Sequence, residues 1–157
     1  WYERGIALTV ARRERSFPEA KTVNYLAAVS GIAAARRRGA VEPLIVDREG
    51  LVREGETANF FAVVAGMLVT PGRGVLPGVT RAVVLELARG RLPVQERDLP
   101  FPELAEAEEA FITATNKEIV PVVNIGGKSV GSGAPGPETR GLMRAFRDLT
   151  EAFAASG

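Results

Sequence analysis

The segment NFFAVVAGMLVT, residues 59–70, decides the fold class, because it contains two apolar runs separated by a short turn. Residues 59–64 and 67–70 are rich in the aromatic and β-branched side chains that favour strands, and Ala65-Gly66 lies between them. This pattern predicts a β-hairpin. A second hairpin is predicted just before it, from residues 44–47 and 51–53.

Segments with helical periodicity lie before and after these hairpins in the sequence. Apolar side chains recur at steps of three and four residues in three segments, which predicts helices over residues 22–38, 82–89 and 138–154. Gly39 is expected to end the first helix, and Thr80 is expected to be the N-cap of the second. A short acidic helix is predicted to begin at Pro102.

Further apolar runs predict strands over residues 1–10, 92–99, 110–113 and 119–125. Hairpins combined with long helices are typical of a mixed α/β domain with much antiparallel pairing. The pattern lacks the regular alternation of strand and helix that a doubly wound sheet requires.

Composition limits the possible chemistry. The chain has 157 residues, of which 46% are hydrophobic and 25% charged, as expected for one globular domain. Its 20 basic and 19 acidic residues nearly cancel, which gives no reason to expect nucleic-acid or anionic-membrane binding. The absence of Cys and His excludes disulfides, thiol nucleophiles and imidazole bases, and no metal site is expected.

The sequence also suggests where the protein is located and whether the chain is part of a longer polypeptide. No stretch approaches the roughly 20 apolar residues of a membrane helix, and we expect a cytoplasmic protein. Residues 1–4 resemble neither a signal peptide nor a native start, so we expect the chain to be the later part of a longer polypeptide.

Four sites could carry chemistry, and each also has a structural explanation. Residues 75–81 form a glycine-bearing loop that enters a helix, where backbone N–H groups and a hydroxyl could bind an anion, although many helices begin in this way. Residues 113–116 are a polar cluster at a strand end, which could equally be an ordinary turn. Glu54 could enter the core with a cationic partner or face water, and Lys21 could be an exposed lysine before a helix.

Lysines are uncommon in this chain, since the other basic residues are arginines. The lysines are Lys21, Lys117 and Lys128.

In combination, the four sites resemble one family, the class IV aminotransferases, which are the fold-type IV pyridoxal phosphate enzymes. The segments that carry the resemblance are Lys21-Thr22-Val23-Asn24-Tyr25-Leu26, Glu54-Gly55 with Asn59-Phe60-Phe61, Leu76-Pro77-Gly78-Val79-Thr80-Arg81, and Thr113-Ala114-Thr115 with Glu118-Ile119-Val120-Pro121-Val122.

The resemblance implies a fold, a cofactor and a role for each matching residue. The fold would be a mixed, largely antiparallel pseudo-barrel flanked by helices, and the cofactor pyridoxal 5'-phosphate. Lys21 would form the Schiff base and carry the α-proton during transamination, while Glu54 would keep the pyridine nitrogen protonated. The remaining cofactor contacts would be Tyr25 at the ring hydroxyl, Leu76 against the ring, and Val79, Thr80 and Thr115 at the phosphate. Ala114, Thr115 and Asn116 would bind the substrate carboxylate.

The resemblance also implies partners. An amino acid and a 2-oxo acid would be the substrates, residues 1–157 would be the C-terminal cofactor-binding domain, a smaller N-terminal domain would precede it, and the protein would be a homodimer. Tyr25 and the Pro-Gly-Val-Thr-Arg motif favour a branched-chain-like or D-amino-acid-like transaminase over an aminodeoxychorismate lyase.

Two alternatives from other classes remain open at this stage. A non-catalytic phosphate-binding module would use the loop at residues 78–80 and leave Lys21 unmodified. A structural domain would use the acidic segment at residues 103–109 and the terminal helix for protein contacts.

Overall fold

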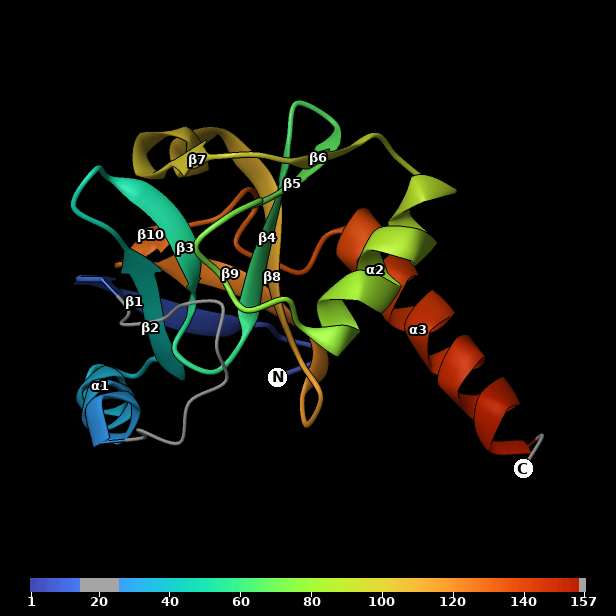
Figure 1. Ribbon diagram of the computed structural model, residues 1–157, viewed down its shortest axis with the longest axis horizontal. Helices are drawn as coiled ribbons and strands as arrows, with labels where there is room; N and C mark the ends of the chain where they lie inside the picture. Colours follow the sequence, from blue (N-terminus) through green and yellow to red (C-terminus); the bar gives the residue numbers. More distant parts are fainter. Residues whose placement is uncertain (15–25, 156–157) are drawn as a thin grey trace.

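Ten strands form one sheet in the computed structural model of the chain, which describes residues 1–14 and 26–155 (Figure 1). The strands are β1 (Ile6–Arg12), β2 (Glu42–Val46), β3 (Leu51–Gly55), β4 (Asn59–Val64), β5 (Met67–Thr70), β6 (Val94–Glu96), β7 (Leu99–Pro100), β8 (Ala107–Ala114), β9 (Glu118–Ile125) and β10 (Lys128–Ser129). The helices are α1 (Leu26–Arg36), α2 (Val79–Arg89), the 3₁₀ helix η1 (Phe101–Glu106) and α3 (Pro137–Ala155). None of these described helices combines the length and the apolar character that a bilayer crossing demands.

The sheet is curled, and its strand order shows why. The order is β6-β5-β4-β8-β9-β1-β2-β3-β7, with β10 paired to β9. The two end strands, β6 and β7, are separated in the chain only by Arg97 and Asp98, which can span no more than about 11 Å. The two ends of the strand order therefore lie close together, as in a barrel.

Pairing within the sheet is mostly antiparallel. The parallel pairs are β1 with β2, β1 with β9, and β5 with β6, and the other six pairs are antiparallel. The expected mixed, largely antiparallel pseudo-barrel flanked by helices is confirmed.

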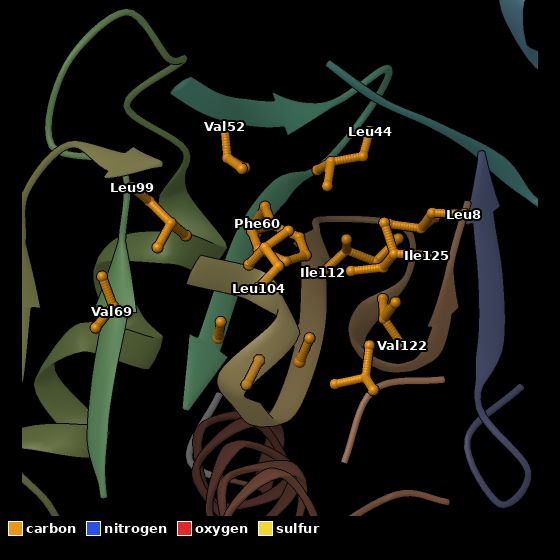
Figure 2. Close-up of a cluster of buried hydrophobic side chains, with 14 of the residues drawn as sticks. Leu8, Leu44, Val52, Phe60, Val69, Leu99, Leu104, Ile112, Val122 and Ile125 are labelled. Carbon is orange, nitrogen blue, oxygen red and sulfur yellow. The ribbon is translucent and has the colours of Figure 1, made fainter. Parts of the chain in front are cut away.

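Two apolar cores lie on opposite faces of the sheet because side chains alternate along each strand. Phe60 of β4 and Ile112 of β8 belong to the core inside the curl (Figure 2). Their neighbours Phe61 and Phe111 face outward and stack with ring centroids 4.8 Å apart. This second core receives α2 and α3, which pack side by side on one side of the sheet (Figure 1).

Most of the expected elements are present. Both hairpins form, as β2–β3 and β4–β5. The second and third predicted helices correspond to α2 and α3, and the first to α1, whose predicted first turn at residues 22–25 lies outside the described residues. Gly39 has a φ of 75°, as a glycine that ends a helix often does.

Two sequence predictions are wrong. Thr80 is not the N-cap of α2, because the helix begins at Val79 and already includes Thr80, and Gly78 is the N-cap. The strand predicted over residues 92–99 is broken at Arg97 and Asp98. It is broken because its first part pairs with β5 and its last part with β3, at the two ends of the strand order.

Candidate functional site

Glu54 is a buried carboxylate near the end of β3, and it is 2% exposed. Its Oε2 accepts a hydrogen bond from Asn59 Nδ2 and another from the backbone N–H of Leu76, each 3.1 Å long. A buried carboxylate requires such donors, since its desolvation is costly. Glu54 therefore joins the β3–β4 hairpin to the loop that precedes α2.

Asn59, the first residue of β4, fixes the end of that loop. Its Nδ2 also donates to the carbonyl oxygen of Leu76, at 2.7 Å. A Cβ atom on Gly78 would lie 2.2 Å from Asn59 Oδ1, so only glycine fits there without movement. Asn59 is not among the site residues predicted from the sequence, although an amide at the start of an otherwise apolar strand is a signal that points to it.

The start of α2 can attract an anion. Gly78 is its N-cap, and no side chain in the described part of the chain caps this helix. The first N–H groups of a helix have no intrahelical acceptor and lie at the positive end of its dipole. Val79 is 77% exposed, whereas the side chain of Thr80 is buried. Both residues lie in the turn where a phosphate would bind.

The polar turn between β8 and β9 lies next to the start of β4. Thr113 is opposite Asn59 in the β4–β8 register, which places their Cβ atoms about 5 Å apart. The turn follows directly, and the backbone N–H of Lys117 donates to the carbonyl oxygen of Ala114 at 3.0 Å to close it. Thr115 and Asn116 at its tip are exposed, and their N–H groups have no backbone acceptor among the described residues.

The structure thus brings most of the predicted site residues to one end of the sheet. Glu54 and Leu76 are in direct contact, and Asn59 links them to the start of α2 and to the turn at residues 114–116. Lys21 and Tyr25 lie outside the described residues, so their roles remain predictions.

A second feature is a cavity of about 280 Å³, and no predicted site residue within the described part of the chain lines it. Its lining is Arg13, Glu14, Ile45, Asp47, Glu49, Arg53 and Gly74. Burial acts to raise the pKa of Asp47, but hydrogen bonds from the Leu51 N–H and from Arg53 outweigh it and hold this pKa below its ordinary value. Three carboxylates and two arginines line this cavity, and Arg53 pairs with Asp47 in its wall.

Comparison with known proteins gives a consistent result. A family model described as amino-transferase class IV matches residues 1–125. The branched-chain-amino-acid aminotransferase of Escherichia coli K12 is 35% identical over 156 residues, which are 94% of this chain and 50% of that protein. The D-alanine aminotransferase of Bacillus licheniformis is 35% identical over 131 residues, 82% of this chain and 46% of that protein.

Solved structures agree with the sequence comparison. The branched-chain amino acid aminotransferase of Thermobaculum terrenum in its PLP form superposes with a TM-score of 0.87 at 32% identity, covering 94% of this chain and 51% of that one. The chain spans half or less of the length of the curated relatives it matches.

Proposed function

The chain belongs to the class IV aminotransferases, and from that premise we propose that it forms the pyridoxal phosphate-binding part of an enzyme that exchanges an amino group between an amino acid and a 2-oxo acid. One observation carries the proposal. The buried carboxylate of Glu54 and the uncapped start of α2 are held together through Asn59 and Leu76.

This arrangement fits pyridoxal 5'-phosphate. A buried carboxylate oriented by the Asn59 amide and the Leu76 N–H suits a protonated pyridine nitrogen, and an uncapped helix start suits a phosphate. When bound, the cofactor supplies an electron sink for the charge that forms as the α-proton leaves the substrate.

Each residue has a defined task in the proposal. Glu54 holds the proton on the ring nitrogen and Leu76 lies against the ring. The phosphate is bound by the N–H groups of Val79 and Thr80 and by the hydroxyl of Thr115, and Tyr25 donates to the ring hydroxyl.

The turn after β8 would receive the substrate. The exposed N–H groups of Thr115 and Asn116 suit a carboxylate, and Ala114 leaves room beside them. Lys21 would bind the cofactor covalently and then move the α-proton. An amine does this well when its surroundings lower its pKa enough to give the neutral form near neutral pH.

Transamination is proposed over the lyase reaction because the curated relatives with the matches above are aminotransferases. Their names cover both branched-chain and D-alanine substrates. A screen of L- and D-amino acids against a set of 2-oxo acids identifies the donor.

We also propose that the protein works in the cytoplasm as a homodimer, with a smaller domain completing the pocket. Leu26 and Val29 on α1 are 77% and 61% exposed, as expected for apolar side chains that a partner covers. Light scattering that finds a monomer at micromolar concentration would contradict the dimer.

Chemical trapping tests the function directly. The purified protein is incubated with pyridoxal 5'-phosphate, reduced with borohydride and digested, and the pyridoxyl mass is located by mass spectrometry. We expect it on the peptide that contains Lys21, and we expect Lys21→Ala to abolish both the label and transamination while Lys128→Ala changes neither. Label on Lys117 or Lys128 would refute the assignment of Lys21, and no label would support the non-catalytic phosphate-binding module.

A further inference from the structure

Lys117 is engaged by two side chains from other parts of the chain. Its Nζ lies 2.7 Å from Glu42 Oε2, and it also lies 2.7 Å from Thr57 Oγ1. The Thr57 hydroxyl in turn donates to the same Glu42 oxygen, at 2.6 Å. Glu42 begins β2 and Thr57 lies between β3 and β4, so this cluster connects three segments that are distant in sequence.

The ion pair is largely removed from water. The side chains of Lys117 and Glu42 are 13% and 1% exposed. Glu42 Oε1 has no hydrogen-bond partner in the part of the chain that the structure describes. A buried pair of this kind adds little stability, because the cost of desolvating two charges offsets their attraction. The role of the Lys117–Glu42 ion pair is therefore more reasonably to position the chain segments that it joins.

The backbone of Lys117 is anchored as well. Its N–H closes the turn by donating to Ala114, and its carbonyl oxygen accepts the hydroxyl of Tyr2 at 3.1 Å. Arg147 of α3 lies over the Tyr2 ring, 5.1 Å from the ring centroid. Lys117 is therefore held at its N–H, at its carbonyl and at its ammonium group.

Held in this way, Lys117 fixes one end of the turn at residues 114–117. Thr115 and Asn116, whose N–H groups have no backbone acceptor in the described residues, lie between Ala114 and Lys117. Two such donors recognise a carboxylate only if their directions are fixed in advance. A tether at the fourth residue of the turn fixes them.

We propose that Lys117 is a positioning residue, whose ion pair with Glu42 holds the turn at residues 114–117 in the shape that binds the carboxylate of the amino acid and of the 2-oxo acid. The ammonium group does not touch the substrate and takes no part in proton transfer. This inference rests on the proposed function.

A double variant separates positioning from stability. Lys117→Met alone would leave Glu42 as a buried, uncompensated charge and could unfold the protein. The variant that combines Lys117→Met with Glu42→Gln removes both charges, and the new amide still accepts the Thr57 hydroxyl. Its melting temperature is therefore expected to remain close to that of the unchanged protein. Lys128→Met is the matched control, because Lys128 is exposed on β10.

Two readouts are used. In steady-state kinetics, we expect KM for the amino donor to rise about tenfold in the double variant while kcat changes less than about threefold, since binding common to ground and transition states is lost. In calorimetry on cofactor-loaded protein, we expect the dissociation constant of 4-methylvaleric acid, an unreactive carboxylate, to rise by a similar factor. The control variant keeps both values.

The outcomes distinguish the two proposals. If Lys21 is labelled in the trapping experiment but the double variant keeps the KM and the dissociation constant of the unchanged protein, the role of Lys117 is refuted and the proposed function stands. If Lys21 is never labelled, both proposals are refuted.

Discussion

Two neutral donors, the Asn59 amide and the Leu76 N–H, fix the Glu54 carboxylate at the centre of the candidate site. Both donors bind an oxygen of Glu54, and an amide side chain at this position would offer an oxygen of similar geometry. At the scale of single residues, the position and the charge of Glu54 can therefore be tested separately.

Glu54→Gln tests the charge. The amide oxygen of glutamine can still accept from Asn59 and Leu76, so we expect the fold and cofactor binding to be retained. Without the negative charge the ring nitrogen is no longer held protonated, and we expect kcat to fall about 100-fold. Steady-state kinetics together with the cofactor absorbance spectrum provide the measurement.

Glu54→Ala is the comparison variant. It leaves the Asn59 amide and the Leu76 N–H buried without this acceptor, and we expect a loss of about 1–3 kcal/mol in the free energy of unfolding. An unchanged kcat in Glu54→Gln would deny Glu54 its role at the ring nitrogen.

At the scale of elements, the start of α2 depends on close contact between a glycine and a distant amide. The backbone angles of Gly78, φ −71° and ψ 139°, are ones that any residue can adopt. What excludes a side chain there is the Asn59 amide, which would lie 2.2 Å from a Cβ atom. The requirement for glycine is thus steric and not conformational.

Gly78→Ala is expected to displace the Asn59 side chain and break its hydrogen bonds to Glu54 and Leu76. We expect it to lower the free energy of unfolding by about 1–3 kcal/mol in urea titrations. Gly90→Ala at the other end of α2 is the control, since its φ is −86° and no atom of the described residues, apart from its chain neighbours, lies within 4 Å of its Cβ position. The control is expected to be neutral or to stabilise by up to about 1 kcal/mol. Equal effects of the two substitutions would contradict the steric argument.

Helix α3 is capped by a side chain from the sheet. Glu109 of β8 accepts hydrogen bonds from the backbone N–H groups of Glu138 and Thr139, at 3.0 Å and 2.7 Å. A carboxylate at a helix start also interacts favourably with the helix dipole. One buried residue of β8 therefore both caps α3 and attaches it to the sheet.

Glu109→Ala is expected to lower the free energy of unfolding by about 1–3 kcal/mol, because one buried and one partly buried N–H group lose their acceptor. Its neighbour Glu108 accepts an exposed hydrogen bond from the N–H of Gly66, at 3.2 Å, and no other among the described residues. Glu108→Ala is therefore expected to cost less than about 0.5 kcal/mol. Urea unfolding followed by circular dichroism measures both, and similar losses in the two variants would refute the capping role.

The elements that the sequence predicts well are those whose signal is local. The hairpin at residues 59–70 carries its strands and its turn in twelve consecutive residues, and the structure contains it. The predicted N-cap of α2 is wrong, because Thr80 has the usual chemistry of a cap. The actual N-cap, Gly78, contacts Asn59, which lies 19 residues before it in the sequence.

In the candidate site too, the residues with a local sequence signal are the ones that could be predicted. Glu54, Leu76 and the segments at residues 78–80 and 114–116 could be named from motifs, and the structure places them at one end of the sheet. Asn59, Glu42 and Lys117 were not assigned to the site, because their importance arises from contacts between strands that no local pattern contains.

At the scale of the whole molecule, ion pairs close the curled sheet where its two end strands meet. Arg73 pairs with Asp98 at 2.5 Å, and Arg53 pairs with Asp47 at 2.6 Å and with Asp98 at 3.4 Å. The hydrogen bond from Arg73 holds the pKa of Asp98 below its ordinary value. The pKa of Asp47 is also lowered, since its hydrogen bonds outweigh the effect of burial.

These shifts give a pH dependence with a definite sign. Both carboxyl groups have a lower pKa in the folded state than in the unfolded state, so they stabilise the fold above the ordinary aspartate pKa of about 4 and cease to do so as the pH falls below it. We expect the free energy of unfolding to decrease between about pH 5 and pH 2. The combined variant Asp47→Asn and Asp98→Asn should show a shallower decrease in urea titrations over this range. The same slope in both proteins would refute the contribution of this pair.

The place of β1 in the sheet has a consequence for biosynthesis. β1 lies between β2 and β9, and it pairs with both in parallel. On the ribosome β2 follows within a few dozen residues, but β9 ends only at Ile125. The edge of β1 that pairs with β9 thus remains unpaired until most of the chain has been translated. An unpaired strand edge can associate with other nascent chains. Slow translation before β9 should therefore increase the demand for chaperones more than slow translation after it.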